Sequence, residues 1–364
     1  MQQTFEGIYN GKNVFVTGHT GFKGSWLALW LTRLGANVTG YSRAPNTDPD
    51  HFSLLKLDMR SVIGELLDID LLTKTMQAAA PEIVFHLAAQ PLVRDSYDDP
   101  VETYNSNVIG SLHVCEAARR CPSVRAVVAI TTDKVYENYE WERGYREDDR
   151  LGGYDPYSSS KACAEILYSS YRNSFWNVAE YGKSHDVLLT AVRAGNVIGG
   201  GDWSKDRLIP DIVKATAKGE RTVIRNPSAT RPWQHVLECL SGYLLVGSRL
   251  LKGEKQFASA FNFGPPDTDE LPVRAVCDMV SRHWPKADFE YPQLSGQPHE
   301  AGLLKLDCAK AHAQLQWQPM WESETAIAKT VDWYRNYYQD GAVGSSDDLE
   351  EYVSLAKQRG AVWA

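Results

Sequence analysis

Short apolar runs alternate with longer amphipathic stretches through the first half of the chain. Five runs have the length and the β-branched residues typical of buried strands: residues 13–17, 38–41, 83–87, 126–131 and 187–192. Helix-like stretches lie between them, around residues 107–120 and 159–175. This alternation predicts an α/β fold in which helices cover both faces of a doubly wound parallel sheet. Ligands of such sheets bind at the carboxyl ends of the strands.

A glycine-rich segment directly follows the first predicted strand. It reads Gly18-His19-Thr20-Gly21-Phe22-Lys23-Gly24 and leads into a Trp- and Leu-rich stretch that ends at Gly35. The order is strand, tight turn and helix, followed by a second strand. Glycines let backbone amides approach a pyrophosphate, and the positive end of the helix favours its charge. We therefore predict a Rossmann-type dinucleotide site held by Gly18, Thr20, Gly21, Phe22, Lys23 and Gly24.

Tyr157 and Lys161 stand four residues apart, about one turn along a predicted helix. At about 4 Å and an effective dielectric of about 20, two unit charges interact by roughly 4 kcal/mol, or about three pK units. The ammonium is therefore expected to lower the pKa of the phenol from about 10 toward about 7. Such a phenol can take a proton from a hydroxyl while hydride leaves the same carbon. Because short motifs also match by chance, this interpretation depends on the surrounding residues.

Polar residues follow the predicted strand at residues 126–131, namely Thr132, Asp133 and Lys134. Carboxyl ends of parallel strands share one edge of the sheet, so these residues and Tyr157 are expected to converge on the nicotinamide of the cofactor. Taken singly, such residues are also typical of turns and helix caps. Their order after a glycine turn and before a Tyr–Lys pair favours a catalytic site.

These motifs resemble the extended short-chain dehydrogenase/reductase family, and within it the nucleotide-sugar 4,6-dehydratases. The resemblance covers nearly the whole chain and includes residues 86–90 (HLAAQ), 107–111 (NVIGS) and 131–136 (TTDKVY). Later stretches resemble the members that act on CDP-glucose: residues 193–203, 231–236 and 299–302. The resemblance implies NAD as the cofactor and CDP-glucose as the substrate.

The reaction implied by the resemblance removes water across C5 and C6 of the sugar. Tyr157 takes the proton of the C4 hydroxyl while hydride passes to NAD, Lys161 supports the phenol, and Thr132 hydrogen-bonds the reacting oxygen. The new C4 ketone acidifies the C5 proton, and the C6 hydroxyl leaves. Hydride then returns to C6, which gives a 4-keto-6-deoxy sugar without net oxidation. By resemblance, Asp133 and Lys134 are placed for the two proton transfers at C5 and C6.

Lys134 departs from the better-known dehydratase pattern, which has a glutamate after the aspartate. We expect Lys134 to act in proton transfer and Asp133 to act as the acid toward the C6 oxygen. Two roles stay open for the lysine. A neutral amine would take the C5 proton, whereas a charged ammonium would stabilise the enolate.

The adenosine end of the cofactor site leaves an alternative open. The second strand ends in Gly40-Tyr41-Ser42-Arg43, without the acidic residue that holds the ribose of NAD. Arg43 would also suit a 2′-phosphate, so NADP remains an alternative to NAD. The resemblance assigns further cofactor contacts to Asp68, Ile69, Leu87, Ala88, Ala89, Tyr157 and Lys161.

Substrate contacts are expected mainly from the second half of the chain. The candidates are Gln90, Asn196, Arg207, Arg231, Tyr291 and His299. An arginine fork suits phosphate oxygens because it can donate paired hydrogen bonds. Trp203 and Trp233 either cover the base or sugar or belong to the core. His86 is expected to be structural, its ring satisfying a backbone carbonyl.

The chain has 364 residues, of which 43% are hydrophobic, enough for one large core or two unequal ones. We expect a nucleotide domain over residues 1–192 and a mainly substrate-binding lobe over residues 193–364. Strands such as residues 261–263 are expected to rejoin the main sheet. After a helix at residues 325–338, a polar tail around residues 344–348 either folds back or stays mobile.

Charge and composition argue against several classes of protein. The net charge of −8 provides no basic face for nucleic acid, and no stretch reaches the roughly 18 apolar residues of a membrane span. The N-terminus lacks the pattern of a signal peptide, so we expect a cytoplasmic protein. The six cysteines lack metal-binding spacing, so we expect reduced thiols and no metal site. The resemblance implies a homo-oligomer, a dimer or tetramer, with a four-helix interface built from residues 107–120 and 159–175.

Two other functions fit the same scaffold. One is a nucleotide-sugar 4-epimerase, or a dehydratase that acts on another nucleotide-linked hexose. Asp133 and Lys134 argue against the epimerase, which needs no acid–base pair at C5 and C6. The other is a nucleotide-binding regulator without catalysis, against which Thr132, Tyr157 and Lys161 argue, because a pure binder has no use for an activated phenol.

Overall fold

The computed structural model describes residues 1–266, 270–292 and 303–364. Its centre is a seven-stranded sheet in which every neighbouring pair is parallel. The strand order is β11 (Ala260–Asn262), β6 (Leu188–Arg193), β5 (Ala126–Ile130), β4 (Ile83–His86), β1 (Asn13–Thr17), β2 (Asn37–Ser42) and β3 (Arg60–Ile63). The order reverses between β1 and β4, which creates the switch point at which ligands of such sheets bind. The predicted doubly wound α/β fold is confirmed.

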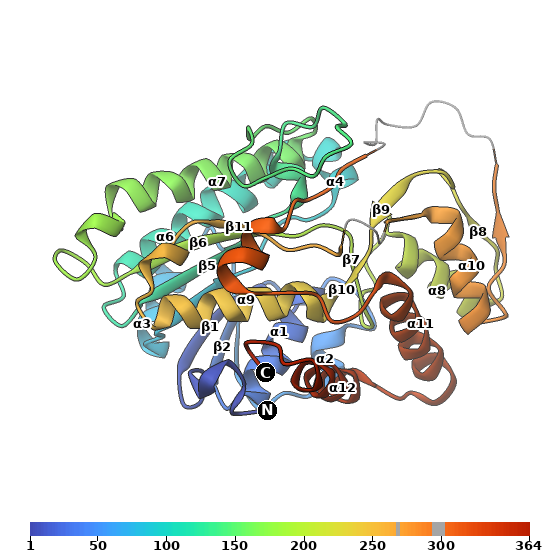
Figure 1. Ribbon diagram of the computed structural model, residues 1–364, viewed down its shortest axis with the longest axis horizontal. Helices are drawn as coiled ribbons and strands as arrows, with labels where there is room; N and C mark the ends of the chain where they lie inside the picture. The colour runs from blue at the N-terminus through green and yellow to red at the C-terminus, as the bar shows by residue number, and fades with distance from the viewer. Residues whose placement is uncertain (267–269, 293–302) are drawn as a thin grey trace.

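Helices cover both faces of this sheet (Figure 1). One face packs against α1 (Phe22–Arg33), α9 (Val236–Leu251) and α12 (Ser345–Gln358). The other face packs against α3 (Ile69–Ala79), α6 (Gly110–Arg119) and α7 (Pro156–Ser174). All residues of β4, β5 and β6 are buried, which explains why their sequences are continuously apolar rather than alternating.

The edge strand β3 has no counterpart among the predicted strands. Three of its four residues, Arg60, Ser61 and Ile63, are exposed, so the strand carries no apolar run. Only its parallel pairing with β2 defines it. An edge strand of this kind is fixed by backbone hydrogen bonds to its neighbour rather than by a local sequence pattern.

The second half of the chain divides between the main sheet and a smaller lobe. In this lobe, α8 (Leu208–Lys218), α10 (Val273–His283) and α11 (Ser323–Asp340) share a separate apolar cluster, seen at the right of Figure 1. Three short strand pairs accompany these helices: β7 (Val197–Ile198) with β10 (Gln234–His235), β9 (Thr230–Pro232) with β12 (Glu270–Pro272), and β8 (Thr222–Val223) with β13 (Phe289–Glu290).

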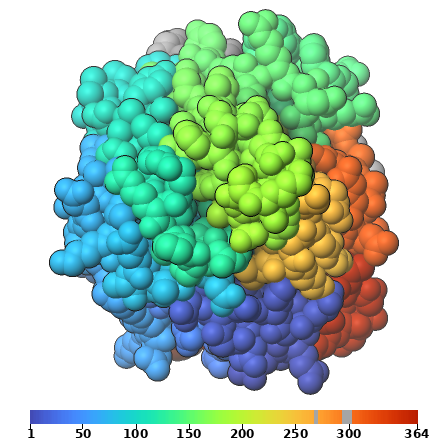
Figure 2. Space-filling view, turned by 90° about the vertical axis from the view of Figure 1, so that its left-hand side faces the viewer, coloured from blue at the N-terminus to red at the C-terminus, as the bar shows by residue number. Residues whose placement is uncertain are grey.

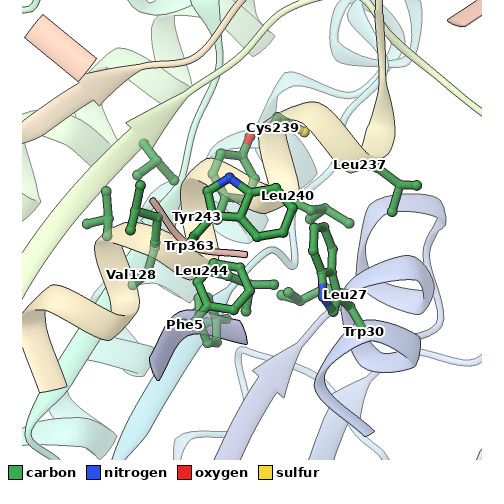
Figure 3. Packing of buried hydrophobic residues seen from close by; sticks show 14 of the residues in the cluster. Phe5, Leu27, Trp30, Val128, Leu237, Cys239, Leu240, Tyr243, Leu244 and Trp363 are labelled. Atoms are coloured by element: carbon green, nitrogen blue, oxygen red, sulfur yellow. The ribbon is translucent and has the colours of Figure 1, made fainter. Parts of the chain in front are cut away.

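Residues after position 235 also complete the core of the main sheet. Leu240 and Leu244 of α9 lie against Trp30 of α1, and Phe5 and Trp363 bring both chain ends to the same cluster (Figure 3). From the side, segments near residues 10, 120, 180 and 250 share one surface (Figure 2). The expected return of residues 261–263 is confirmed by β11, which pairs with β6.

The polar tail folds back onto the molecule. Residues 345–358 form α12, whose Leu349, Tyr352 and Val353 are buried against the main core. The polar residues of the tail occupy the first turn of this helix. The negative charges of Asp347 and Asp348 interact favourably there with the positive end of the helix dipole. Of the two predicted alternatives, the structure therefore shows the folded one.

Candidate active site

A cleft of about 1290 Å³ lies at the carboxyl ends of the central strands and extends under the smaller lobe. It brings together nineteen of the predicted site residues: Gly18, Thr20, Gly21, Phe22, Lys23, Gly24, Arg43, Leu87, Ala88, Ala89, Gln90, Thr132, Asp133, Lys134, Tyr157, Lys161, Asn196, Arg207 and Arg231. The short helices α2 (His51–Leu55), α4 (Val93–Asp98) and α5 (Pro100–Tyr104) contribute residues to its rim.

The remaining predicted residues are not part of this cleft. Asp68 caps α3 by accepting a hydrogen bond from the Leu71 amide at 2.9 Å, and Ile69 begins that helix. Tyr291 packs on Arg274, with the guanidinium carbon 4.6 Å from its ring centre. These three side chains do not line the cleft, and their expected contacts with cofactor or substrate stay predictions. His299 lies outside the described residues.

The glycine turn has the shape that a pyrophosphate site requires. Gly18 has φ +77°, and a Cβ there would lie 2.7 Å from the Ala88 amide nitrogen. A Cβ on Gly24 would lie only 2.0 Å from the Gly18 oxygen, so the turn packs tightly against α1. The N-cap residue Gly21 supplies no side-chain cap to α1, so the positive helix end faces the cleft. These residues therefore fit a dinucleotide phosphate.

Arg43 lies at the end of the cleft expected to hold adenosine, and two carboxylates already bind it. Its Nε lies 2.5 Å from Glu65 Oε2, and its Nη2 lies 2.6 Å from Glu102 Oε1. A 2′-phosphate would have to compete with these carboxylates, so the arrangement favours the free ribose of NAD. Neither glutamate is predicted from the sequence, since each reaches Arg43 from a distant segment without a motif.

Tyr157 stands in the first turn of α7, beside the end of β5. Asp155 caps this helix through the Ser158 amide at 2.9 Å, and Pro156 occupies its first turn. The phenol is 9% exposed and hydrogen-bonds Thr132, whose hydroxyl donates to Asp133 Oδ1 at 2.9 Å. The fold therefore joins the predicted base and the predicted acid through one threonine.

The electrostatics of the Tyr–Lys pair differ from the prediction. Burial raises the pKa of Tyr157 to about 12, although the hydrogen bond to Thr132 and the charge of Arg207 act in the opposite direction. Burial and the nearby Lys23 lower the pKa of Lys161 to about 8. The Lys161 ammonium donates to the Ile130 carbonyl at 3.1 Å. The expected lowering of the phenol pKa is therefore wrong for this structure, because loss of solvent outweighs the favourable charges.

Asp133 and Lys134 lie beside this pair at the end of β5. Asp133 is 1% exposed, whereas the side chain of Lys134 is 35% exposed and places Nζ 3.7 Å from Asp133 Oδ1. Gly195 makes room for the carboxylate, since a Cβ there would lie 1.9 Å from Asp133 Oδ2. A buried carboxyl and a partly exposed cation thus face the cleft side by side.

Buried polar contacts support the strand ends beneath the site. Glu165 binds Arg193 (Oε2–Nη2, 2.5 Å) and accepts a hydrogen bond from Thr131 at 2.6 Å. His86 contacts the hydroxyls of Thr17 at 2.7 Å and Ser111 at 3.0 Å, rather than the expected carbonyl. Burial lowers the pKa of His86 to about 3, so the ring is neutral and structural, as predicted.

The substrate side of the cleft is lined by Asn196, Arg207, Trp203 and Trp233. Arg207 Nη1 lies 3.7 Å from Asp202 Oδ2, and Asn196 has a φ of +43°. Trp203 and Trp233 line the cleft but are only 6% and 7% exposed. Both indoles therefore serve mainly as core residues that present one edge to the cleft.

The structure shows the state of the cysteines and where potential metal ligands and apolar helices lie. All six cysteines are free thiols, and only Cys163 is not fully buried. Within residues 1–266, 270–292 and 303–364, no His, Cys, Asp and Glu side chains gather in the number needed to hold a metal ion. No helix in these ranges is long and apolar enough to span a bilayer.

Residues 14–263 match the family model described as the NAD dependent epimerase/dehydratase family. The chain belongs to this family. Its cofactor is NAD, and the glycine turn at Gly18 to Gly24 lines the cleft with a shape that fits such a cofactor's phosphates.

Relatives of this chain include both dehydratases and epimerases. A CDP-glucose 4,6-dehydratase from Salmonella typhimurium is 48% identical over 353 residues, covering 95% of this chain and 98% of that protein. A UDP-glucose 4-epimerase from Mycolicibacterium smegmatis is 28% identical over 339 residues, covering 89% of this chain and 99% of that protein.

Solved structures confirm the fold. An epimerase from Methanothermobacter thermautotrophicus superposes with a TM-score of 0.79 at 23% identity, covering 91% of this chain and 94% of that chain. UDP-glucose 4-epimerase from Brucella ovis in complex with NAD gives a TM-score of 0.75 at 22% identity, covering 89% and 97%. At this level of identity the likeness concerns architecture alone.

Proposed function

We propose that the protein is a CDP-glucose 4,6-dehydratase, which converts CDP-D-glucose to CDP-4-keto-6-deoxy-D-glucose and water. The 48% identity to the Salmonella enzyme along nearly the full length of both chains carries the proposal. The arrangement of Asp133 and Lys134 beside Thr132 and Tyr157 supports it.

Oxidation at C4 begins with Tyr157. The phenolate takes the proton of the C4 hydroxyl, and the Thr132 hydroxyl holds the same oxygen by a hydrogen bond. Burial raises the pKa of the Tyr157 phenol, and the hydrogen bond to Thr132, the charge of Arg207 and the first turn of α7 oppose this effect and stabilise the phenolate. The chemistry supplied by bound NAD is storage of one hydride, taken from C4 and given back at C6.

Elimination across C5 and C6 is assigned to Asp133 and Lys134. The C5 proton, acidified by the C4 ketone, passes to the Lys134 amine, and its electron pair forms the C5–C6 double bond. The C6–O bond breaks while Asp133 gives its proton to the departing oxygen, which leaves as water. Their separation of 3.7 Å allows one side chain to serve C5 while the other serves C6.

The test of this function is the mass of the product. Incubation with CDP-glucose and no added reductant should yield a sugar nucleotide that has lost one water, and Tyr157→Phe should abolish this change. The same incubation with dTDP-, UDP- and GDP-glucose shows which nucleotide base the enzyme accepts. Unchanged mass with inverted C4 would instead indicate a 4-epimerase, and no reaction on any of the four sugars would indicate a binding protein.

We further propose that the enzyme works in the cytoplasm as a homo-oligomer, either a dimer or a tetramer. Six unpaired thiols are typical of a reducing compartment. Exposed apolar side chains on neighbouring helices support self-association: Val101 of α5 is 69% exposed and Ile166 of α7 is 60% exposed.

A further inference from the structure

The two oxygens of Asp133 have different surroundings. Oδ1 accepts a hydrogen bond from Thr132 at 2.9 Å and lies 3.7 Å from Lys134 Nζ. Oδ2 faces Gly195 and has no hydrogen-bond partner among the described residues. A buried carboxylate oxygen without a donor costs free energy, so a donor is expected beside it.

Gln234 provides a second acceptor of the same kind. It is 2% exposed, and its Nε2 donates to the carbonyls of Gly195 at 3.1 Å and Phe263 at 3.0 Å. Two carbonyl acceptors fix the orientation of the amide, because only the NH₂ group can donate to them. The opposite atom, Oε1, is therefore an acceptor, and within the described chain it is also unpartnered.

A small cavity connects these two residues behind the active site. Its volume is about 10 Å³, and Asp133 and Gln234 both line it. This volume is close to the minimum that admits the centre of one water molecule. Three of its other wall residues, Pro232, Pro265 and Pro266, have no backbone N–H to donate.

We propose that one ordered water occupies this cavity, donating one hydrogen bond to Asp133 Oδ2 and the other to Gln234 Oε1. A water molecule has the two donors that two unpaired acceptors require. Gln234 then acts as a positioning residue: it anchors the water that holds the rear oxygen of Asp133. The carboxyl plane is thereby fixed with Oδ1 toward the cleft. This consequence rests on the proposed function, in which Asp133 protonates the departing C6 oxygen.

Crystals of the NAD-loaded protein at a resolution that shows ordered waters test the site directly. The expected result is one water within hydrogen-bond distance of Asp133 Oδ2 and Gln234 Oε1. A dry cavity, or one in which the bordering Lys305 donates to both acceptors, would overturn the proposal. This readout does not depend on the substrate, so it stands even if no nucleotide sugar reacts.

A cavity-filling variant tests the consequence. Gly264 lines the cavity, and among the described residues a Cβ there would meet Cys308 Sγ at 3.5 Å and Leu306 Cβ at 3.8 Å. Gly264→Ala should therefore fold normally and exclude the water without removing either acceptor. Gly344→Ala, whose Cβ would lie 3.6 Å from Trp333 and outside the cleft, is the matched control.

The expected effect is specific to the elimination step. Loss of the hydrogen bond that stabilises the Asp133 carboxylate as its proton leaves should lower kcat by about tenfold or more, with KM for CDP-glucose within about twofold. Reduced nicotinamide should accumulate during turnover, because C4 oxidation continues while elimination slows. Gln234→Met should give the same pattern. Wild-type kcat in Gly264→Ala, or oxidation and elimination slowed equally, would contradict the positioning role. A wild-type protein inactive on every sugar would instead refute the proposed function.

Discussion

Lys134 and Asp133 are neighbours in sequence but differ in burial. The aspartate is enclosed by Thr132 and Gly195, whereas a third of the lysine side chain reaches solvent. A cation on a flexible stem can follow the C5 proton, or the enolate, as the sugar ring changes shape. The two roles left open by the sequence both place its amine at C5.

We expect Lys134→Met to bind substrate but to lose dehydration. General acid–base groups contribute about 10²–10⁴-fold, so kcat should fall by at least about 100-fold, with KM within about twofold. Steady-state kinetics with CDP-glucose measure this effect. Lys183→Met, at an exposed site outside the cleft, should leave kcat unchanged. Near-normal turnover of Lys134→Met would remove the lysine from the mechanism.

At the scale of elements, helix α9 connects the nucleotide half to the C-terminal segment through Glu238. The carboxylate accepts hydrogen bonds from the amides of Trp321 at 2.7 Å and Met320 at 2.9 Å, and from the Tyr352 hydroxyl at 2.7 Å. Burial raises its pKa to about 7, even though these donors favour the charged form. Three chain segments therefore meet at one titratable group.

Glu238 should make the stability of the protein depend on pH. Since its pKa rises from 4.5 to about 7 on folding, the folded state binds more protons in this window, and stability falls as pH rises through it. A shift of this size corresponds to about 3 kcal/mol. Urea unfolding at pH 5 and pH 8 should show wild type losing that much relative to Glu238→Gln. Parallel pH profiles for the two proteins would contradict this assignment.

Other elements show how far local patterns reach. Asp155 and Pro156 begin α7 where a cap and a first-turn proline are expected, and Asp68 caps α3 in the same way. This cap uses Oδ1 of Asp68, and the expected contact of Asp68 with the cofactor stays a prediction. The same short-range signal thus predicts where each of these helices begins.

At the scale of the whole molecule, the exposed apolar side chains on α5 and α7 suggest where two copies meet. If α7 belongs to a subunit interface, Ile166→Lys should shift the mass in solution toward the 40.7 kDa of one chain. Light scattering after size-exclusion chromatography measures this. Ile63→Lys is the matched control, because Ile63 is 55% exposed on the edge strand β3. An unchanged oligomer in Ile166→Lys would place the interface elsewhere.

The amino-acid pattern alone predicts the α/β class, the glycine turn and the position of Tyr157 after β5. Each depends on interactions within a few residues, or on an alternation of apolar runs that any buried parallel sheet requires. The same local reasoning could not find Glu65, Glu102 or Gln234, which reach the cleft or its rear wall from distant segments.

The electrostatics of the site and the contact partners of its residues depend instead on how the whole chain packs. The phenol pKa of Tyr157 depends on how much solvent surrounding segments remove, and that burial outweighs the favourable charges. The position of the C-terminal tail also depends on packing. Helix α12 is stable because Leu349 and Tyr352 are buried in the main core. Sequence spacing describes neighbours along the chain, whereas burial and long-range contacts arise only when the whole chain has packed.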